Sequence, residues 1–346
     1  MLVRTENIEY NYIKIKNVCG GMTMTFPLGD KPIRLGILGM TEGNAHPFSW
    51  SAIINGYDKD EMYRWTHELY PTIPDYLSKQ PAHTFGIDGV RVTHVCFTGY
   101  EDIEMAKNCA RAAFIPNVVE RPEDMIGKVD AVICATDIGA EHVKRCKPFI
   151  DARLPIFIDK PLTDNEADLK TIVGWVDGGA HICSSSSLRY KKSLEVYYEN
   201  RYELGKIRYI LSPMAKYWET YGMHAIEQMF PLLGAGFEWV QNAGSYEKPM
   251  VHLHHKDGCD VDIPMGFGFK TNGVTIMAEY GCQVVNDGDS YYCFKKQLDK
   301  FVHFLRTGNE PHPFSDTVEM AKILIAGIMS REQGGRRVYL SEINER

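Results

Sequence analysis

Hydrophobic positions in the first half of the chain form short continuous runs, and segments with helical spacing separate them. The runs predict buried strands at residues 33–38, 90–97, 118–119, 131–135, 155–158 and 180–183. The segments between them predict helices from about residue 47 and over residues 102–112, 140–151 and 164–177. Continuous apolar strands that alternate with helices are typical of a parallel sheet covered by helices on both faces.

From about residue 192 the strands change character, because apolar and polar positions now alternate along them. Such strands are predicted at residues 207–213, 239–244, 249–255, 259–268, 273–280 and 282–286, with helices at 221–233, 290–306 and 315–331. We therefore expect an α/β domain over residues 31–162, followed over residues 163–346 by an α+β domain with a large, mostly antiparallel open sheet.

Two segments fall outside this alternation of strands and helices. Residues 1–30 alternate only weakly and contain Pro27 and Gly29, so we expect an N-terminal extension. Residues 57–89 form a long polar and aromatic connection with three prolines. Connections of that length are usually functional or carry secondary structure of their own, and both outcomes are open here.

The composition is that of a soluble globular protein, with 346 residues, 44% hydrophobic and 24% charged. A net charge of -7 without a run rich in Lys and Arg argues against nucleic acid or an anionic membrane as partner, so a small-molecule ligand is expected. Nine cysteines without CxxC spacing predict reduced core residues in a cytoplasmic protein. No apolar run has the length of a membrane span.

The most informative motif is Asp159-Lys160-Pro161, at the end of the strand predicted at 155–158. A lysine at the carboxyl end of a strand faces the crevice where open α/β sheets bind ligands. The proline disfavours helical geometry at the residue before it, so Lys160 is expected to be held extended. This arrangement suits a general base, and the alternative is a surface lysine that happens to follow a strand.

A glycine-containing turn follows the first predicted strand and opens a helix, as a phosphate-binding turn does. It contains Gly36, Gly39 and Gly43, but Thr41 occupies the second glycine position of the GxGxxG pattern. The Thr41 hydroxyl would be able to donate a hydrogen bond to a phosphate. A simple strand-to-helix turn is the alternative.

Polar residues follow the next predicted strands at the same edge of the sheet. Glu101 or Asp102 stands where a carboxylate would bind the ribose hydroxyls, although Asp102 also suits a helix cap. No Lys or Arg follows that strand before Lys107, which favours NAD and leaves NADP possible. Thr136 and Asp137 either line a dinucleotide or, in the case of Asp137, cap the next helix.

Together these segments resemble the Gfo/Idh/MocA family of NAD(P)-dependent sugar and polyol oxidoreductases, over about residues 31–345. The resemblance implies a Rossmann domain, a second domain with an open sheet, and an active site between them. It is carried by Gly36-Ile37-Leu38-Gly39, residues 131–142, Asp159-Lys160-Pro161-Leu162, Leu188-Arg189-Tyr190, Leu204-Gly205-Lys206-Ile207 and Tyr221-Gly222-Met223-His224. The implied cofactor contacts are Gly36, Gly39, Thr41, Gly43, Glu101, Thr136, Asp137, Asp159 and Lys160.

The resemblance also implies the catalytic residues. Lys160 matches the family's lysine near the nicotinamide and the substrate hydroxyl, and His224 matches the histidine of its Asp-x-Gly-x-His pattern. Thr220 stands where that aspartate is expected, which leaves Glu219, Glu227 or Tyr221 as a replacement.

Hydride transfer from a carbinol leaves a hydroxyl proton to be removed, and a group with a pKa near the working pH removes it best. Burial and a cationic nicotinamide are expected to lower the pKa of Lys160, while a histidine begins nearer the useful range. A purely structural role inside its helix is the alternative for His224.

Four further residues are predicted to contact the substrate together with Lys160 and His224. They are Arg189, Tyr190, Trp218 and Tyr221. A structural ion pair is the alternative for Arg189, and a position at the core edge is the alternative for the aromatic residues. His46 is a further candidate for the crevice.

A sheet face is predicted to form the oligomer contact. His252 and His254 share one face of their strand, but no second pair of ligands at zinc-like spacing accompanies them, so no metal site is predicted. We instead expect a homo-oligomer, a dimer or tetramer, built through this sheet, whose free face is predicted to carry Val251, Leu253 or their neighbours.

The function expected from the sequence is NAD(P)-dependent hydride transfer between nicotinamide and a hydroxyl of a sugar, glycoside or cyclitol. Two alternatives stay open. One is redox-neutral, NAD-dependent glycoside cleavage through a transient keto-sugar. The other is a non-catalytic protein that binds a dinucleotide or a sugar.

Overall fold

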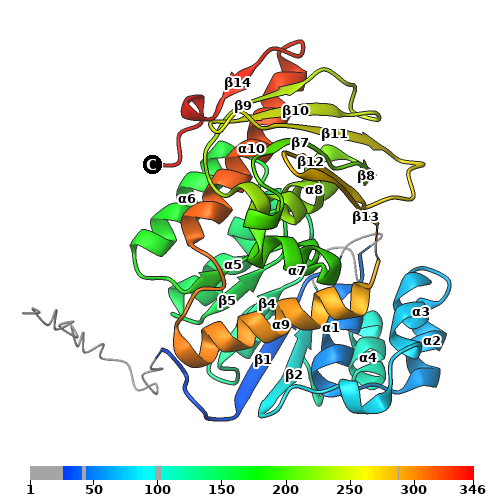
Figure 1. Cartoon of the computed structure of the whole chain (residues 1–346). Coiled ribbons are helices and arrows are strands. Elements are labelled where there is room, and N and C mark those ends of the chain that lie inside the picture. The colour runs from blue at the N-terminus through cyan, green and yellow to red at the C-terminus, as the bar shows by residue number, and fades with distance from the viewer. Residues whose placement is uncertain (1–25, 41–43, 98–102, 287) are drawn as a thin grey trace, which may run out of the picture.

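The computed structural model describes residues 26–40, 44–97, 103–286 and 288–346, which form two sheets with helices packed around them (Figure 1). The first sheet is parallel and has the strand order β3-β2-β1-β4-β5-β6. Its strands are β1 (Ile33–Leu38), β2 (Val90–Cys96), β3 (Asn117–Val118), β4 (Ala131–Cys134), β5 (Ile156–Ile158) and β6 (Ile182–Cys183). The strand order reverses between β1 and β4, so their carboxyl ends form the edge at which such sheets bind ligands.

Helices cover both faces of the parallel sheet, as its continuous apolar strands require. Apolar residues of α1 (His46–Asn55), α4 (Ile103–Ala112) and α9 (Ser290–Thr307) pack on one face. Residues of α5 (His142–Asp151) and α6 (Glu166–Asp177) pack on the other face and continue into the core of the second domain. The Rossmann-like architecture predicted from the sequence is therefore confirmed. The division at residue 162 stays a prediction, with β6 lying beyond it in the first sheet.

The connection at residues 57–89 carries structure of its own. It contains α2 (Lys59–Thr66), α3 (Thr72–Ser78) and a 3₁₀ turn at Ala82–Thr84. The Asp58 side chain caps α2 by accepting hydrogen bonds from the backbone N–H groups of Asp60 and Glu61. These two short helices lie beside α1 and α4 (Figure 1).

The second sheet has eight strands and is mostly antiparallel, with β7 and β11 as a parallel pair. Its order is β13-β12-β7-β11-β10-β9-β14, and β8 pairs with β11. Helices α8 (Trp218–Leu233) and α10 (Phe314–Glu332) cover one face, while α7 (Lys192–Glu199) packs against α8. The strands are β7 (Ile207–Leu211), β8 (Met214–Ala215), β9 (Phe237–Asn242), β10 (Met250–His255), β11 (Asp260–Gly266), β12 (Val274–Ala278), β13 (Gly281–Val285) and β14 (Val338–Tyr339).

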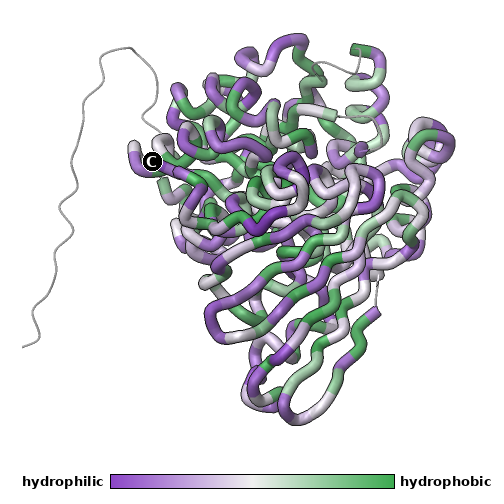
Figure 2. Tube along the Cα trace, turned by 90° about the horizontal axis from the view of Figure 1, so that it is seen from above, coloured by the Kyte–Doolittle hydropathy of each residue, from purple (hydrophilic) through white to green (hydrophobic). Residues whose placement is uncertain are grey.

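Hydrophobic and hydrophilic residues alternate along these strands, so the sheet has one buried and one open face (Figure 2). The sequence named Val251, Leu253 or their neighbours as the residues of the open face, and Val251 and Leu253 themselves are fully buried in the core. Their neighbours His252 and His254 occupy the open face instead, where each lies beside a carboxylate of β11. The strand was predicted correctly, but the alternation alone did not say which set of residues faces the helices.

No disulfide bond joins the described cysteines, and of these only Cys282 is exposed. Within the described ranges, no helix has the length and apolar character needed to cross a membrane.

Candidate active site

The turns after β1 and β4 approach each other at the switch point of the parallel sheet. Gly39 has a φ of 82°, and a Cβ there would lie 3.2 Å from the backbone nitrogen of Thr136. Glycine is therefore required both by the backbone conformation and by the close approach. Gly39 therefore lies at the edge of the sheet where α/β proteins hold a pyrophosphate against backbone N–H groups.

The structure does not test four of the predicted cofactor contacts. Gly36 lies inside β1, where a Cβ would come within 2.6 Å of Met125 Sδ, so packing explains its small size. Thr41, Gly43 and Glu101 lie outside the described residues. Their roles in cofactor binding stay predictions.

His142 ties the turns after β4 and β5 together. Its Nε2 lies 2.9 Å from the Thr136 carbonyl oxygen, and its Nδ1 lies 3.1 Å from the Leu162 carbonyl oxygen. The imidazole is fully buried, so it packs and bonds within the fold. It fixes the position of the Asp159-Lys160-Pro161 motif relative to Thr136.

Lys160 is 2% exposed and is held by three elements. Its Nζ lies 3.6 Å from Asp137 Oδ2 and donates a hydrogen bond to the Thr220 carbonyl oxygen at 3.4 Å. Its backbone N–H donates to Asp159 Oδ1 at 2.7 Å. The other oxygen of Asp159 lies 3.0 Å from His46 Nδ1, so His46 reaches this site.

The charge state of Lys160 differs from the sequence prediction. Burial lowers the pKa of the lysine, but the carboxylates of Asp137 and Asp159 outweigh it, and the net pKa is raised above its ordinary value. Lys160 is therefore an ammonium at neutral pH, which donates hydrogen bonds and stabilises negative charge. The sequence argument named burial and a cationic nicotinamide as causes of a lowered pKa, and it omitted the carboxylate of Asp137 after β4.

His224 lies on α8 and is half-buried. Its Nδ1 is 2.6 Å from Ser186 Oγ. Burial, with the charge of Lys160 adding to it, holds the pKa of His224 well below its ordinary value. His224 is thus a neutral imidazole at neutral pH, suited to hydrogen bonding and poorly suited to accepting a proton.

Tyr221, one turn before His224, is in contact with two lysines. Lys216 Nζ donates a hydrogen bond to the Tyr221 hydroxyl at 2.8 Å, and Lys160 Nζ lies 5.2 Å from the centre of its ring. The rings of Tyr221 and His224 meet edge to face, with centroids 4.9 Å apart. The sequence named Tyr221 as a substrate contact, but it contained no signal for the pairing with Lys216.

These side chains line two adjoining cavities. The first, of about 430 Å³, is bounded by Asn44, His46, Asp137 and Lys160 from the first domain. The second, of about 350 Å³, lies over Met214 and residues 269–272 of the second domain. Both cavities are lined by Tyr221, His224, Ser290 and Phe294, which therefore stand at their junction. The two cavities together therefore form a candidate active site between the two domains.

The insertion supplies one wall of the first cavity. Its contributing residues run from Leu69 to Ile73 and include Tyr76 of α3. This wall is mainly apolar and aromatic, whereas the opposite side carries charges. Sequence reasoning left open what the insertion does, because nothing in residues 57–89 indicates which part of the fold they contact.

Three predicted substrate contacts do not line the two cavities, so their contact with a substrate stays a prediction. Arg189 Nη1 lies 2.9 Å from Glu227 Oε2 in a buried ion pair, the alternative that the sequence left open. Tyr190 is also buried. Trp218 is fully buried, and its Nε1 donates to the Leu324 carbonyl oxygen at 2.8 Å, so it is a core residue between α8 and α10.

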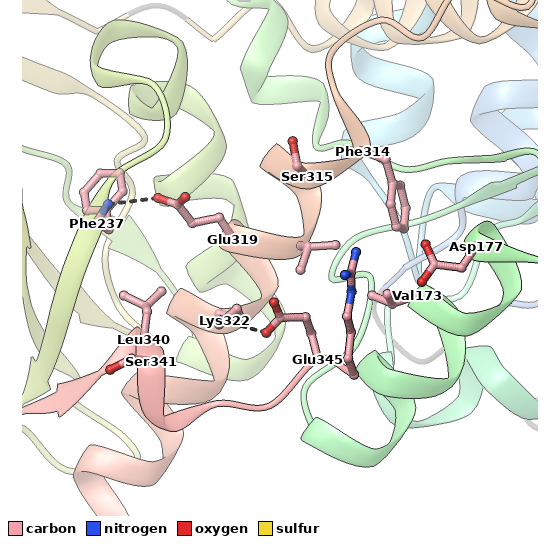
Figure 3. A pocket seen from close by; sticks show the side chains of 12 residues that line it. Val173, Asp177, Phe237, Phe314, Ser315, Glu319, Lys322, Leu340, Ser341 and Glu345 are labelled. Atoms are coloured by element: carbon pink, nitrogen blue, oxygen red, sulfur yellow. Dashed lines mark hydrogen bonds and ion pairs between the residues drawn. The ribbon is translucent and has the colours of Figure 1, made fainter.

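A third cavity, of about 490 Å³, lies away from these residues, between α6, α10 and the C-terminal segment (Figure 3). Three of its charged side chains are engaged within the fold. Glu319 accepts hydrogen bonds from the backbone N–H groups of Gly236 and Phe237, and Lys322 pairs with Glu345. This cavity lies away from the carboxyl ends of β1 and β4, unlike the cavities around Lys160.

Comparison with known proteins supports the assignment of the fold. No protein-family model and no curated protein sequence matches this chain. A probable dehydrogenase from Thermotoga maritima shares the fold with a TM-score of 0.69 and 14% identity, covering 90% of this chain and 100% of that one.

Two further solved structures contain a nicotinamide cofactor. The myo-inositol dehydrogenase from Lactobacillus casei in complex with NAD(H) and myo-inositol has a TM-score of 0.67 at 14% identity, covering 89% of this chain and 96% of that one. GenD2 from gentamicin A biosynthesis, in complex with NAD, has a TM-score of 0.68 at 14% identity, covering 94% and 99%. This chain has the Gfo/Idh/MocA-type dehydrogenase fold. The resemblance inferred from the sequence is thus confirmed at the level of the fold.

Proposed function

We propose that this protein is an NAD-dependent dehydrogenase that oxidises a hydroxyl group of a cyclitol, sugar or glycoside. The observation that carries the proposal is the buried ammonium of Lys160, which stands after β5 beside Asp137 and lines a cavity of about 430 Å³. It occupies the edge of the parallel sheet where ligands bind. The likeness to solved dehydrogenases, two of whose structures contain NAD or NAD(H), supports the same cofactor class.

The residues at this edge fit a dinucleotide. Gly39 has no side chain to fill the space beside the Thr136 backbone, and Asp137 follows Thr136 after β4. A bound nicotinamide would accept hydride from the carbinol carbon. Gly39, Thr136 and Asp137 would hold the cofactor, with Asp137 and Lys160 nearest the reacting end.

The cavity suits a molecule with many hydroxyl groups and an apolar ring face. Asn44, His46, Lys160 and His224 offer polar atoms to hydroxyls. The rings of Tyr76 and Phe294 offer flat surfaces to C–H groups. Small-molecule sites combine a mainly apolar lining with a few placed polar groups in this way.

Lys160 acts in the proposal by electrostatics. Its ammonium would donate a hydrogen bond to the substrate oxygen and stabilise the negative charge that develops there. Asp137, Asp159 and the Thr220 carbonyl hold the ammonium in place. His224, kept neutral by burial, would orient a second hydroxyl through a hydrogen bond.

The proposal is tested by mixing the protein with NAD and a panel of inositols, sugars and glycosides, and following the absorbance of reduced nicotinamide. We expect NADH formation with at least one polyol, and its loss in Lys160→Met. Nucleotide that stays bound while no net reduction occurs, with cleavage of a glycoside, would favour the redox-neutral reaction. A protein that binds no nicotinamide nucleotide would contradict both.

A further inference from the structure

The group that replaces the aspartate expected at Thr220 follows from what each candidate contacts. Glu219 is paired with Arg331, with their atoms 2.5 Å apart. Glu227 accepts from Arg189 and from the Ser186 backbone N–H, so it supports the loop that holds His224. Neither glutamate lines the two cavities, whereas Tyr221 lines both.

The backbone conformation of Lys216 places its side chain against Tyr221. Lys216 follows β8 and has a φ of 63°, a left-handed conformation that a lysine rarely adopts. Its backbone N–H donates to the Gly266 carbonyl oxygen at 3.1 Å, which continues the pairing of β8 with β11. Such strained residues persist where the surrounding structure over-determines them, and they cluster at functional sites.

We propose that Tyr221, with Lys216 as its partner, exchanges the hydroxyl proton of the substrate. The inference rests on the proposed function and names the proton-transfer group of that same site. During oxidation, hydride with its two electrons passes from the carbinol carbon to oxidised nicotinamide dinucleotide, and the hydroxyl proton passes to the phenolate oxygen of Tyr221. The products are the ketone, the reduced dinucleotide and the tyrosine phenol, which later returns its proton to solvent. In the reverse direction the phenol supplies the proton to the carbonyl oxygen.

The other two candidates for this step are in unsuitable protonation states. Lys160 is held as an ammonium by Asp137 and Asp159, which raise its pKa. His224 has a pKa well below its ordinary value because of burial, so it is a weak base. Tyr221, by contrast, lines both cavities, and Lys216 Nζ donates a hydrogen bond to its phenolic oxygen at 2.8 Å.

The pH dependence of the reaction should depend on the charged and titratable groups around Tyr221. Lys216 contacts its hydroxyl from the loop after β8, Lys160 faces its ring from the turn after β5, and His224 contacts it from the next turn of α8. Asp137 lies behind Lys160. Removing the charge of Lys216 should therefore move the ionisation of Tyr221, and the pH dependence of alcohol oxidation with it, to higher pH.

The first test compares Tyr221→Phe with Tyr217→Phe. Phenylalanine at residue 221 keeps a ring between Lys160 and His224 and removes only the hydroxyl. Tyr217 is its matched control, because it stacks on Tyr246 instead. We expect Tyr221→Phe to lower kcat by about 10² to 10⁴, the usual contribution of general acid–base catalysis, with NAD affinity unchanged. Near-normal kcat in Tyr221→Phe would overturn the proposal.

The second test needs no turnover and therefore stands apart from the proposed function. The ionisation of Tyr221 is followed by the ultraviolet absorbance of tyrosinate, as the difference between the wild-type protein and Tyr221→Phe. We expect Lys216→Met to move this ionisation to higher pH and Lys216→Arg, which keeps the charge, to move it much less. An ionisation that is the same in Lys216→Met and wild type would refute the pairing, even if the protein proves to be a dehydrogenase.

Discussion

The ammonium nitrogen of Lys160 lies 3.6 Å from Oδ2 of Asp137, so the turn after β5 is joined to the turn after β4 by a buried charge pair. The same nitrogen donates to the carbonyl oxygen of Thr220 on α8, which belongs to the second domain. Lys160 is thus positioned by both domains. Under the proposed function, its positive charge would lie beside the substrate oxygen that develops negative charge.

Replacing Lys160 by methionine should abolish most of the activity while the fold is kept. Methionine is unbranched and of similar length, but it carries no charge and donates no hydrogen bond. We expect kcat to fall by about 10² to 10⁴, with NAD affinity retained. Lys147→Met is the control, because Lys147 is exposed on α5 and pairs only with Asp151. A Lys160→Met protein with near-normal turnover would exclude the electrostatic role.

His224→Asn should reduce activity without moving the pH optimum. Burial keeps the pKa of His224 well below its ordinary value, so the imidazole is neutral across the neutral range in the wild type. Its loss therefore removes a hydrogen bond and no titrating charge. The measurement is the pH profile of kcat/KM, with Ser186→Ala as a milder variant of the same contact. A displaced optimum in His224→Asn would show that the histidine titrates during turnover.

The sequence predicted the fold more completely than the site. The strands of the first sheet were recognisable because most of their residues are buried and apolar, and Lys160 was recognisable because Pro161 follows it at a strand end. Nothing in the sequence indicated that Lys216 contacts Tyr221 or that Ser186 contacts His224. Packing between loops and α8 brings these residues together. The pKa of Lys160 was misjudged for the same reason, since Asp137 is 23 positions earlier in the chain.

The stability of the protein should depend on His312 at acidic pH. Burial lowers the pKa of His312 from 6.5 to about 3, with Arg189 adding to the effect. A histidine whose pKa is lower in the folded state contributes stability above pH 6.5, and loses it as the pH falls toward 3, because the unfolded chain binds the proton first. The free energy of unfolding should fall by at most about 1.4 kcal/mol per pH unit in this range.

The His312 effect is measured by urea unfolding at pH 7 and pH 5 in His312→Gln and the wild type. We expect a smaller loss between the two pH values in the variant. His83→Gln, at an exposed position, is the control and should behave as the wild type. Equal pH dependence in His312→Gln and the wild type would rule out the linkage.

We expect the open face of the second sheet to join copies of this chain in a dimer or tetramer. It carries exposed apolar side chains, among them Val284 at 73% and Met277 at 42% exposure, and exposed apolar groups of this kind mark interfaces. The double variant Val284→Glu with Met277→Glu should lower the mass measured by light scattering. Val196→Glu is the control, because Val196 is exposed on α7. A wild-type mass of 39.3 kDa, that of one chain, would contradict this interface.

The central claim is that a nicotinamide dinucleotide binds across the carboxyl ends of β1 and β4, and calorimetric titration of NAD into the wild type, Gly39→Val and Gly56→Ala tests it most directly. Gly39 and Gly56 have nearly the same φ, 82° and 84°, but only at Gly39 would a Cβ meet another turn, 3.2 Å from the Thr136 nitrogen. We predict that NAD binds to the wild type and to Gly56→Ala, and that binding is lost in a folded Gly39→Val protein. Unchanged NAD affinity in Gly39→Val, or a wild type that binds neither NAD nor NADP, would contradict the account.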